Sequence, residues 1–88
     1  MVEKFVDDEH GFLVWRNRHW QGFIVNCNRK PAPSYLVLHK AACDSLVKHE
    51  NYTTREYIKV CSDTRSELER WARDEVGGEL TRCGECSP

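Results

Sequence analysis

Short apolar runs separated by polar segments mark the first half of the chain. One run, Gly22–Cys27, is rich in Phe, Ile and Val, which favour strands. A second run, Tyr35–His39, is short and largely apolar. The segment between them, 28–34, contains two prolines and several polar residues, which predict a loop. The pattern therefore predicts two strands that pair as a hairpin with a long connection.

The second half begins with a segment that alternates in the manner of a strand. Ile58 and Val60 fall on one side of the segment 56–61. Lys59 and Cys61 fall on the other side, because successive side chains of a strand point to opposite faces. This alternation predicts a third strand with one apolar face.

The clearest element is a helix over about 64–76. Thr64 and Glu67 have the spacing of a capping box, in which side chains satisfy free backbone N–H groups at the start of a helix. Four apolar residues then recur on one helical face: Leu68, Trp71, Ala72 and Val76. Gly77 and Gly78 predict the end of the helix, because glycine adopts the left-handed C-cap conformation without steric cost.

The remaining segments carry weaker patterns. Residues 1–10 predict a loose or weakly helical lead-in, and the run Gly11–Trp15 is too short to distinguish a strand from a helix. The residues after His39 predict a short helix over 41–47. We therefore predict an α+β fold for a single domain of residues 1–88, with a short antiparallel sheet, one main helix and one short helix.

The composition points to a metal site. A chain of 88 residues has a small core and often depends on a metal, disulfides or a partner. It has five cysteines, an odd number, and neither a signal-peptide pattern nor an apolar run long enough to cross a bilayer. We therefore expect a cytoplasmic protein with no membrane partner and a metal-binding cysteine cluster. The alternative is a secreted disulfide protein.

Four residues have the ligand types and spacing of a zinc site. His39 and Cys43 form an H-x3-C pair, and Cys83 and Cys86 form a C-x2-C pair about forty residues later. Imidazole and thiolate groups hold zinc in closed, tetrahedral structural sites, which leave no position for water. We predict one structural Zn²⁺ that joins the 35–43 corner to the C-terminal turn, so that the domain is zinc-stabilised.

The other cysteines leave alternatives open. Cys61 lies just before the main helix and is a substitute for one ligand such as His39, or else a buried strand cysteine. Cys27 has no chelating neighbour and is expected to be a free core thiol. A redox role for the Cys83–Cys86 pair is also an alternative, although the pair follows a helix here and a thioredoxin-like pair precedes one.

Three segments of residues 35–88 carry a family resemblance: YLVLHKAAC, SELERWA and GGELTRCGECSP. Their order and spacing resemble the metal-binding domain of bacterial Ada-type DNA repair proteins, and small bacterial proteins with an H-x3-C and C-x2-C frame look related. The resemblance implies a small α/β zinc domain that touches the DNA backbone and accepts a methyl group from a phosphotriester. The methyl-accepting cysteine of that family is its first ligand, where this chain has His39, a far poorer nucleophile. Residues 1–34 have no counterpart.

The charge is unevenly distributed. The net charge of −1 argues against an indiscriminate nucleic-acid binder, but residues 14–48 contain six Lys and Arg against one acidic residue. Aromatic residues are interleaved with these cations, and cations with exposed rings suit phosphates and bases. The predicted nucleic-acid contacts are Arg16, Arg18, Arg29, Lys30 and Lys40. The alternative is a solvated basic face around a core of the same aromatic residues.

The sequence thus favours a structural-zinc domain that binds DNA or RNA and has no catalytic activity. One alternative is a zinc-stabilised protein-interaction module, or a subunit or regulator of a larger bacterial or phage complex, because net charge near zero and exposed aromatic residues also suit such a role. A second alternative is an Ada-like methyl acceptor that uses a zinc thiolate.

Overall fold

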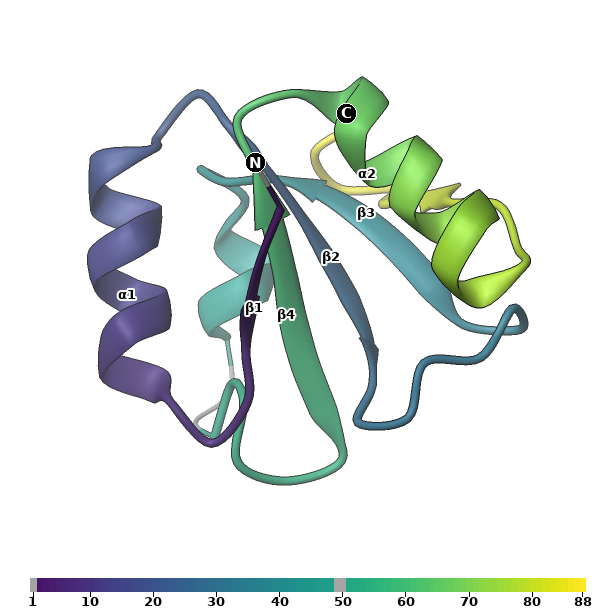
Figure 1. The fold of residues 1–88 in the computed structure, drawn as a ribbon. Helices are drawn as coiled ribbons and strands as arrows, with labels where there is room; N and C mark the ends of the chain where they lie inside the picture. The colour runs from purple at the N-terminus through teal and green to yellow at the C-terminus, as the bar shows by residue number, and fades with distance from the viewer. Residues whose placement is uncertain (1, 49–50) are drawn as a thin grey trace.

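The computed structural model describes residues 2–48 and 51–88, which form one twisted sheet with a helix on each face (Figure 1). The five strands are β1 (Glu3–Phe5), β2 (Phe23–Asn28), β3 (Leu36–Lys40), β4 (Tyr57–Ser62) and β5 (Thr81–Arg82). They lie in the order β1-β4-β2-β3-β5. The helical segments are α1 (Glu9–Arg18), η1 (Asp44–Val47), α2 (Arg65–Trp71) and η2 (Ala72–Val76). The predicted α+β fold class is confirmed.

The three central strands are those that the apolar pattern predicts. β2 pairs with β3 as an antiparallel hairpin, with Val25 opposite Leu38. On its other edge β2 pairs with β4, also antiparallel, with Val25 opposite Val60. All three side chains are fully buried, because they point to the same face of the sheet.

Helix α2 covers this apolar face. Leu68 and Trp71 pack against the strands, and the cluster that they complete consists of Val25, Cys27, Leu36, Leu38, Ile58, Val60 and Ala72. Cys27 is therefore a free core thiol, as predicted. Thr64 caps the helix, since its hydroxyl accepts a hydrogen bond from the Glu67 N–H at 3.4 Å.

The predicted helix over 64–76 corresponds to α2 followed by the single wider turn η2. The turn is π-helical because Gly77 N–H donates to the Ala72 carbonyl, five residues earlier, at 2.8 Å. Gly77 has φ +80°, the left-handed conformation expected at a helix end, and Gly78 N–H shares the same carbonyl at 3.0 Å.

The loose or weakly helical lead-in predicted for residues 1–10 is wrong for Glu3–Phe5, which form a strand, while a helix begins only at Glu9. Strand β1 pairs antiparallel with β4, with Glu3 opposite Cys61 and Phe5 opposite Lys59. Helix α1 then begins after Asp8, whose carboxylate accepts a hydrogen bond from the Gly11 N–H at 2.8 Å. A three-residue edge strand has no period of its own, so its partner strand decides the structure of this segment.

The sheet also differs from the prediction at its other edge. Strand β5 lies parallel to β3, with Val37 opposite Thr81, so the sheet is mixed and not purely antiparallel. The chain reaches this position after crossing the apolar face in α2 and η2. Just beyond β5, the Cys83 N–H donates to the Leu38 carbonyl at 2.9 Å, which extends the pairing towards the metal ligands.

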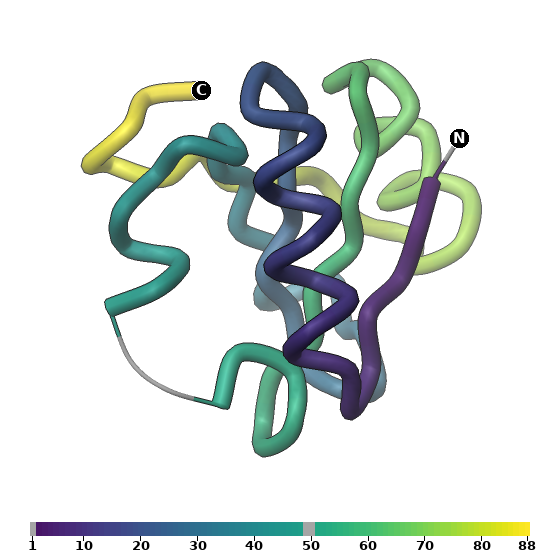
Figure 2. Tube along the Cα trace, turned by 90° about the vertical axis from the view of Figure 1, so that its left-hand side faces the viewer, coloured from purple at the N-terminus to yellow at the C-terminus, as the bar shows by residue number. Residues whose placement is uncertain are grey.

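Helix α1 lies on the opposite face of the sheet from α2, as the side view shows (Figure 2). Phe12 and Trp15 of α1 pack on Ile24, and Leu46 of η1 belongs to the same cluster. The short helix expected after His39 is confirmed as η1. Among the described residues, 2–48 and 51–88, no helix has the length and apolar character needed to span a membrane.

Candidate metal centre

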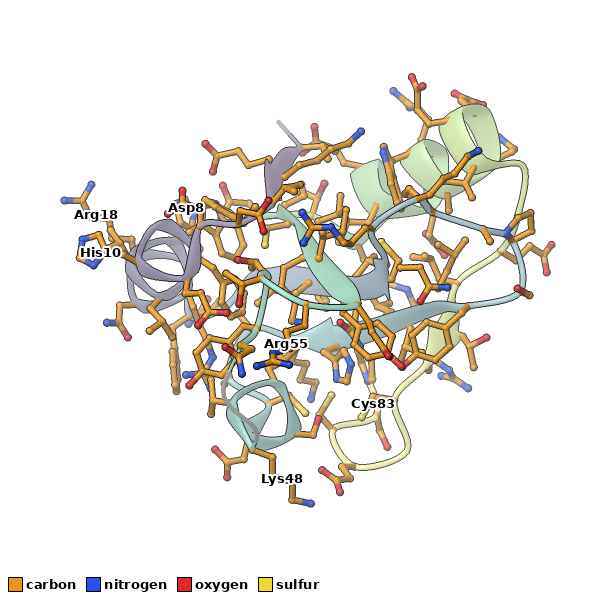
Figure 3. The ribbon with its side chains drawn as sticks, turned by 90° about the horizontal axis from the view of Figure 1, so that it is seen from below. Asp8, His10, Arg18, Lys48, Arg55 and Cys83 are labelled. Carbon is orange, nitrogen blue, oxygen red and sulfur yellow. The ribbon has the colours of Figure 1, made fainter. Side chains whose placement is uncertain are left out.

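The two ligand pairs predicted from spacing lie together in the structure. His39 is near the end of β3, Cys43 lies in the turn before η1, and Cys83 and Cys86 follow β5. One potential ligand atom from each residue lies within 4.8 Å of each of the others. Figure 3 shows Cys83 facing η1 from the C-terminal segment. The four groups are compatible with one bound metal ion.

Backbone hydrogen bonds bring the C-x2-C pair to the end of β3. The Lys40 N–H donates to Cys86 Sγ at 3.3 Å, and the Glu85 N–H donates to Cys83 Sγ at 3.4 Å. The Ser87 N–H donates to the Cys83 carbonyl at 3.1 Å and closes the turn between the two cysteines. N–H groups directed at sulfur stabilise thiolates, which are the ligating form of cysteine.

Ser45 joins the cluster without being one of the four predicted ligands. Its Oγ lies 3.0 Å from Cys43 Sγ, 3.3 Å from His39 Nδ1 and 3.8 Å from Cys83 Sγ. The hydroxyl thus contacts three of the four candidate ligands, and such neighbours orient ligand side chains. Its position two residues after Cys43 was the available sequence signal, but serine is too common in turns for that signal to be specific.

Arg16 stabilises the corner that carries Cys43. Its side chain is buried, at 8% exposure, and donates to the Ala41 carbonyl at 2.6 Å and to the Cys43 carbonyl at 3.3 Å. The predicted role of Arg16 as a phosphate contact does not fit this burial. Its charge is directed inwards, towards carbonyls of the ligand-bearing turn.

The protonation of His39 suits a ligand. Burial, assisted by the positive charge of Lys59, lowers the pKa of His39 to about 4. The imidazole is therefore neutral at pH 7, which is the form that binds a metal.

The environments of Cys86 and Cys83 shift the pKa values of their thiols in opposite directions. Burial and the neighbouring Cys43 thiol raise the pKa of Cys86 to about 11, although the Lys40 N–H acts in the other direction. Burial also opposes ionisation of Cys83, but the backbone N–H groups of Cys86 and Glu85 hold the pKa of its thiol below the usual value. Several thiolates this close repel one another, so a cation between them would stabilise the ionised cluster.

The other two cysteines do not belong to the cluster. Cys61 is fully buried on the α1 face, where burial raises the pKa of its thiol, and the group of candidate ligands contains His39 instead. Burial likewise raises the pKa of Cys27, to about 11, in the α2-covered core. Neither thiol is activated for metal binding or for redox chemistry.

The predicted basic contacts divide between the two ends of the sheet. Arg18 ends α1 and Lys40 ends β3, at the end that carries the metal cluster. Arg29 and Lys30 lie at the other end, after β2. Arg29 donates to Asp7 at 2.5 Å and to the carbonyls of Thr53 and Arg55 at 3.3 and 3.2 Å, so its guanidinium already has partners within the chain.

An exposed tryptophan lies beside the metal-bearing corner. Trp20 is 50% exposed, and its ring stacks on the Arg16 guanidinium, with 4.7 Å between the guanidinium carbon and the ring centroid. Trp20 and Arg18 line one shallow hollow, together with His19. The Ala41 N–H donates to the Gly22 carbonyl at 2.9 Å, so the segment after Trp20 lies against the residue that follows Lys40.

Comparisons with family models, with curated proteins and with solved structures give no match to the chain. The function is therefore inferred from the residues of the site.

Proposed function

We propose that this protein is a structural-zinc domain that binds nucleic acid and has no catalytic activity. The observation that carries the metal assignment is the meeting of one imidazole and three thiol groups within 4.8 Å of one another. This donor set is characteristic of zinc, and four protein ligands complete a tetrahedron. A closed coordination shell leaves no position at which water or substrate would be activated.

The groups around the four ligands suit a zinc site with a net negative charge. A neutral imidazole and three thiolates around Zn²⁺ leave one net negative charge, and each donor directed at the cluster offsets part of it. The N–H groups of Lys40 and Glu85 point at two of the sulfurs, at 3.3 and 3.4 Å. Arg16 adds a buried positive charge next to the Cys43 carbonyl. We therefore place the metal's role in structure: it fastens the C-terminal segment to β3.

The nucleic-acid surface that we propose consists of Arg18, Trp20 and Lys40, at the metal end of the sheet. Support comes from the half-exposed Trp20 ring, which stacks on Arg16, and from Arg18, which lines the same hollow. Lys40 is exposed at the end of β3, next to the residue whose N–H donates to the Gly22 carbonyl. Exposed rings stack on unpaired bases, while Lys and Arg neutralise phosphates. This combination favours single-stranded DNA or RNA over a duplex. Arg29 and Lys30 lie at the other end of the sheet and are not part of this surface.

The test is fluorescence anisotropy with labelled single-stranded DNA, single-stranded RNA and duplex DNA at increasing salt. We expect binding to single strands that weakens as salt rises. Trp20→Ala should cost about 1–3 kcal/mol of binding free energy, because one stacked base is lost. Lys40→Glu should weaken binding, while Lys30→Glu, the same charge change at the opposite end, should not. Equal effects of the two reversals would contradict the proposed surface.

A second candidate function is a protein-interaction module. The same exposed Trp20 favours it, since tryptophan is enriched among the residues that dominate protein interfaces. In that case the chain should co-purify with one stoichiometric partner, Trp20→Ala should abolish the complex, and rising salt should have little effect.

The relation to Ada-type domains remains a prediction from the resemblance, and we propose no methyl transfer. His39 stands where that family has its methyl-accepting cysteine, and an imidazole bound to zinc is a poor nucleophile. Mass spectrometry after exposure to DNA with methylated phosphates should show no added methyl group. A gain of one methyl group on Cys43, Cys83 or Cys86 would overturn this part of the proposal.

A further inference from the structure

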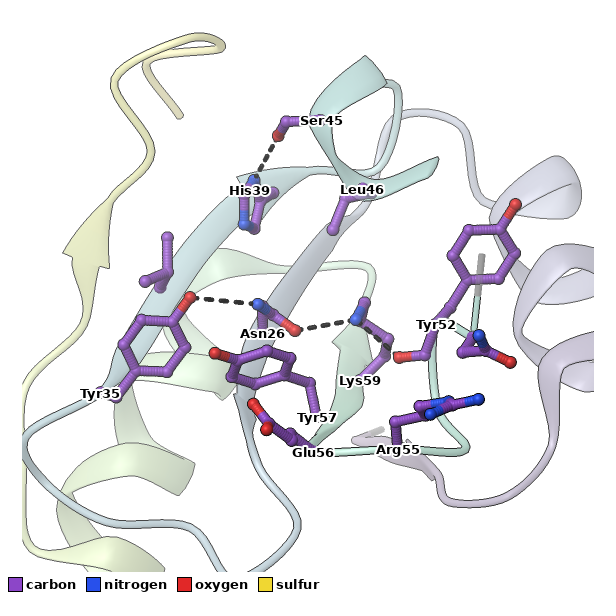
Figure 4. A pocket seen from close by; sticks show the side chains of 12 residues that line it. Asn26, Tyr35, His39, Ser45, Leu46, Tyr52, Arg55, Glu56, Tyr57 and Lys59 are labelled. Atoms are coloured by element: carbon purple, nitrogen blue, oxygen red, sulfur yellow. Dashed lines mark hydrogen bonds between the residues drawn. The ribbon is translucent and has the colours of Figure 1, made fainter. Parts of the chain in front are cut away.

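A cavity of about 540 Å³ lies beside the metal cluster, on the part of the sheet that α1 leaves uncovered (Figure 4). Asn26 and Lys59, from β2 and β4, lie at its floor, and His39 borders it on β3. Its volume is within the range of sites that hold small organic ligands. Neither the metal site nor the proposed nucleic-acid surface uses this space.

The cavity floor carries a buried cation, Lys59, whose two hydrogen-bond acceptors are uncharged. Lys59 is only 5% exposed, and its Nζ donates to Asn26 Oδ1 and to the Tyr52 carbonyl, both at 2.8 Å. An ammonium group has three N–H donors, and in the part of the chain that the structure describes the third has no hydrogen-bond acceptor, although the Phe12 ring centroid lies 5.9 Å from Nζ. Among residues 2–48 and 51–88 no carboxylate forms an ion pair with Lys59. A buried charge of this kind is stabilised by an anion of matching geometry.

The walls are aromatic and lie on both sides of Lys59. Tyr35 and Tyr57 form one wall, with ring centroids 5.5 Å apart, and Tyr52 stands on the opposite side (Figure 4). The Tyr35 hydroxyl accepts a hydrogen bond from Asn26 Nδ2 at 3.3 Å, which ties this wall to the polar floor. Arg55 and Glu56 are exposed and also line the cavity, so their opposite charges offset one another and Lys59 is the cation of the floor. Flat apolar walls over a cationic floor suit a planar ring with an acidic group at one end.

We propose that this cavity binds a small aromatic carboxylate, with the carboxylate at Lys59 and the ring between the tyrosine walls. The carboxylate supplies the missing countercharge and accepts the third N–H of Lys59, while the ring covers the apolar part of the walls. This inference does not depend on the proposed nucleic-acid binding, because the cavity and the surface around Trp20 share no residue.

The test uses the full chain as purified, with its metal, in an NMR titration that follows backbone amides. The probes are benzoate, its neutral analogue benzamide, and uridine 5′-monophosphate. We expect benzoate to shift the amides of β2, β3 and β4 around the cavity, and benzamide to bind about tenfold more weakly, because a charge-assisted hydrogen bond is lost. Equal binding of benzoate and benzamide, or no shift with benzoate at millimolar concentration, would overturn the proposal. So would shifts that only the nucleotide produces.

Substitutions locate the effect. Lys59→Met keeps the length of the side chain but removes the charge, so it should abolish the preference for benzoate over benzamide. Lys30→Met, on the exposed loop after β2, is the matched control and should leave that preference unchanged. Val37→Phe fills the cavity from β3 and should block both probes, which keeps the proposal testable if Lys59→Met does not fold. Retention of benzoate binding in a folded Val37→Phe protein would place the ligand elsewhere and overturn the proposal.

Discussion

The two faces of the sheet are built on different physical principles. The face beneath α2 is a continuous apolar layer, in which Leu68 and Trp71 close over Val25, Leu38 and Val60. The face beneath α1 combines an apolar cluster with polar features: the His/Cys cluster, the inward-directed Arg16 and the cavity around Lys59. Burial of apolar side chains accounts for the packing of the α2 face. The α1 face depends in addition on specific hydrogen bonds and on the candidate metal ligands. The comparison teaches that the candidate sites of this small domain are concentrated on the less regular side.

Metal removal should separate the two faces most strongly. A strong chelator, or Cys83→Ser, should remove the cation between the thiolates and unfold the domain, because structural zinc sites contribute about 10–16 kcal/mol at pH 7. Metal analysis and far-UV circular dichroism check this. Cys27→Ala, in the core beneath α2, should keep stoichiometric zinc. A chelated protein with an unchanged melting temperature would show that the α2 face suffices for folding.

Leu68→Ala should have the next largest effect. It opens a cavity beneath α2, where Leu68 is fully buried, and should lower the free energy of unfolding by about 2–5 kcal/mol. Below the melting temperature zinc content should not change, since the cluster lies on the opposite face. Ser66→Ala, exposed on the same helix, should change stability by less than about 0.5 kcal/mol. Loss of zinc in folded Leu68→Ala protein would contradict the independence of the two faces.

The buried ammonium of Lys59 should give the α1 face a distinct pH dependence. Burial lowers the pKa of Lys59 from 10.5 to about 8, so between these values the unfolded chain binds more protons than the native one. The unfolding free energy should therefore rise with pH across this window, by up to about 3 kcal/mol relative to Lys59→Met. Denaturant unfolding of both proteins from pH 8 to pH 10.5 measures the difference. Parallel pH profiles would show that Lys59 is not desolvated.

Arg16→Met should have the smallest of these effects. Two buried carbonyls lose a charged donor, which should cost about 1–3 kcal/mol of stability, and zinc affinity should fall about tenfold because the turn that holds Cys43 is loosened. Competition with a zinc-binding dye measures the affinity. Arg18→Met is the matched control, since that side chain is exposed on α1 and should leave zinc binding unchanged. Equal affinities for the two variants would remove Arg16 from the metal site.

Local patterns were enough to predict most of the apolar face and the four candidate ligands. Short apolar runs predicted β2 and β3, and periodic patterns predicted β4 and the helix from Thr64. The meeting of His39, Cys43, Cys83 and Cys86 followed from ligand chemistry at known spacing. These patterns can be recognised in the sequence because each depends on residues that are close together along the chain. The fold class followed from their order along the chain.

The features that sequence reasoning missed depend on distant partners. The short edge strands β1 and β5 form only because β4 and β3 offer them free backbone groups. The inward role of Arg16 requires the Ala41 carbonyl, twenty-five residues away. The burial of Lys59 follows from Asn26 and Tyr52, which surround it in space but not in sequence. For Arg16, residue type alone predicted a solvated or phosphate-binding cation, because arginine side chains are mostly exposed.

Strand β3 belongs to both faces at once. Leu38 points into the layer beneath α2, and the next residue, His39, points to the metal cluster. Because neighbouring side chains of a strand alternate, a single inserted or deleted residue before Leu38 would send the imidazole into the apolar layer and the leucine towards the thiols. A one-residue shift in the register of β3 would therefore disrupt both the apolar core and the metal site. This strand should tolerate substitutions far better than changes of length.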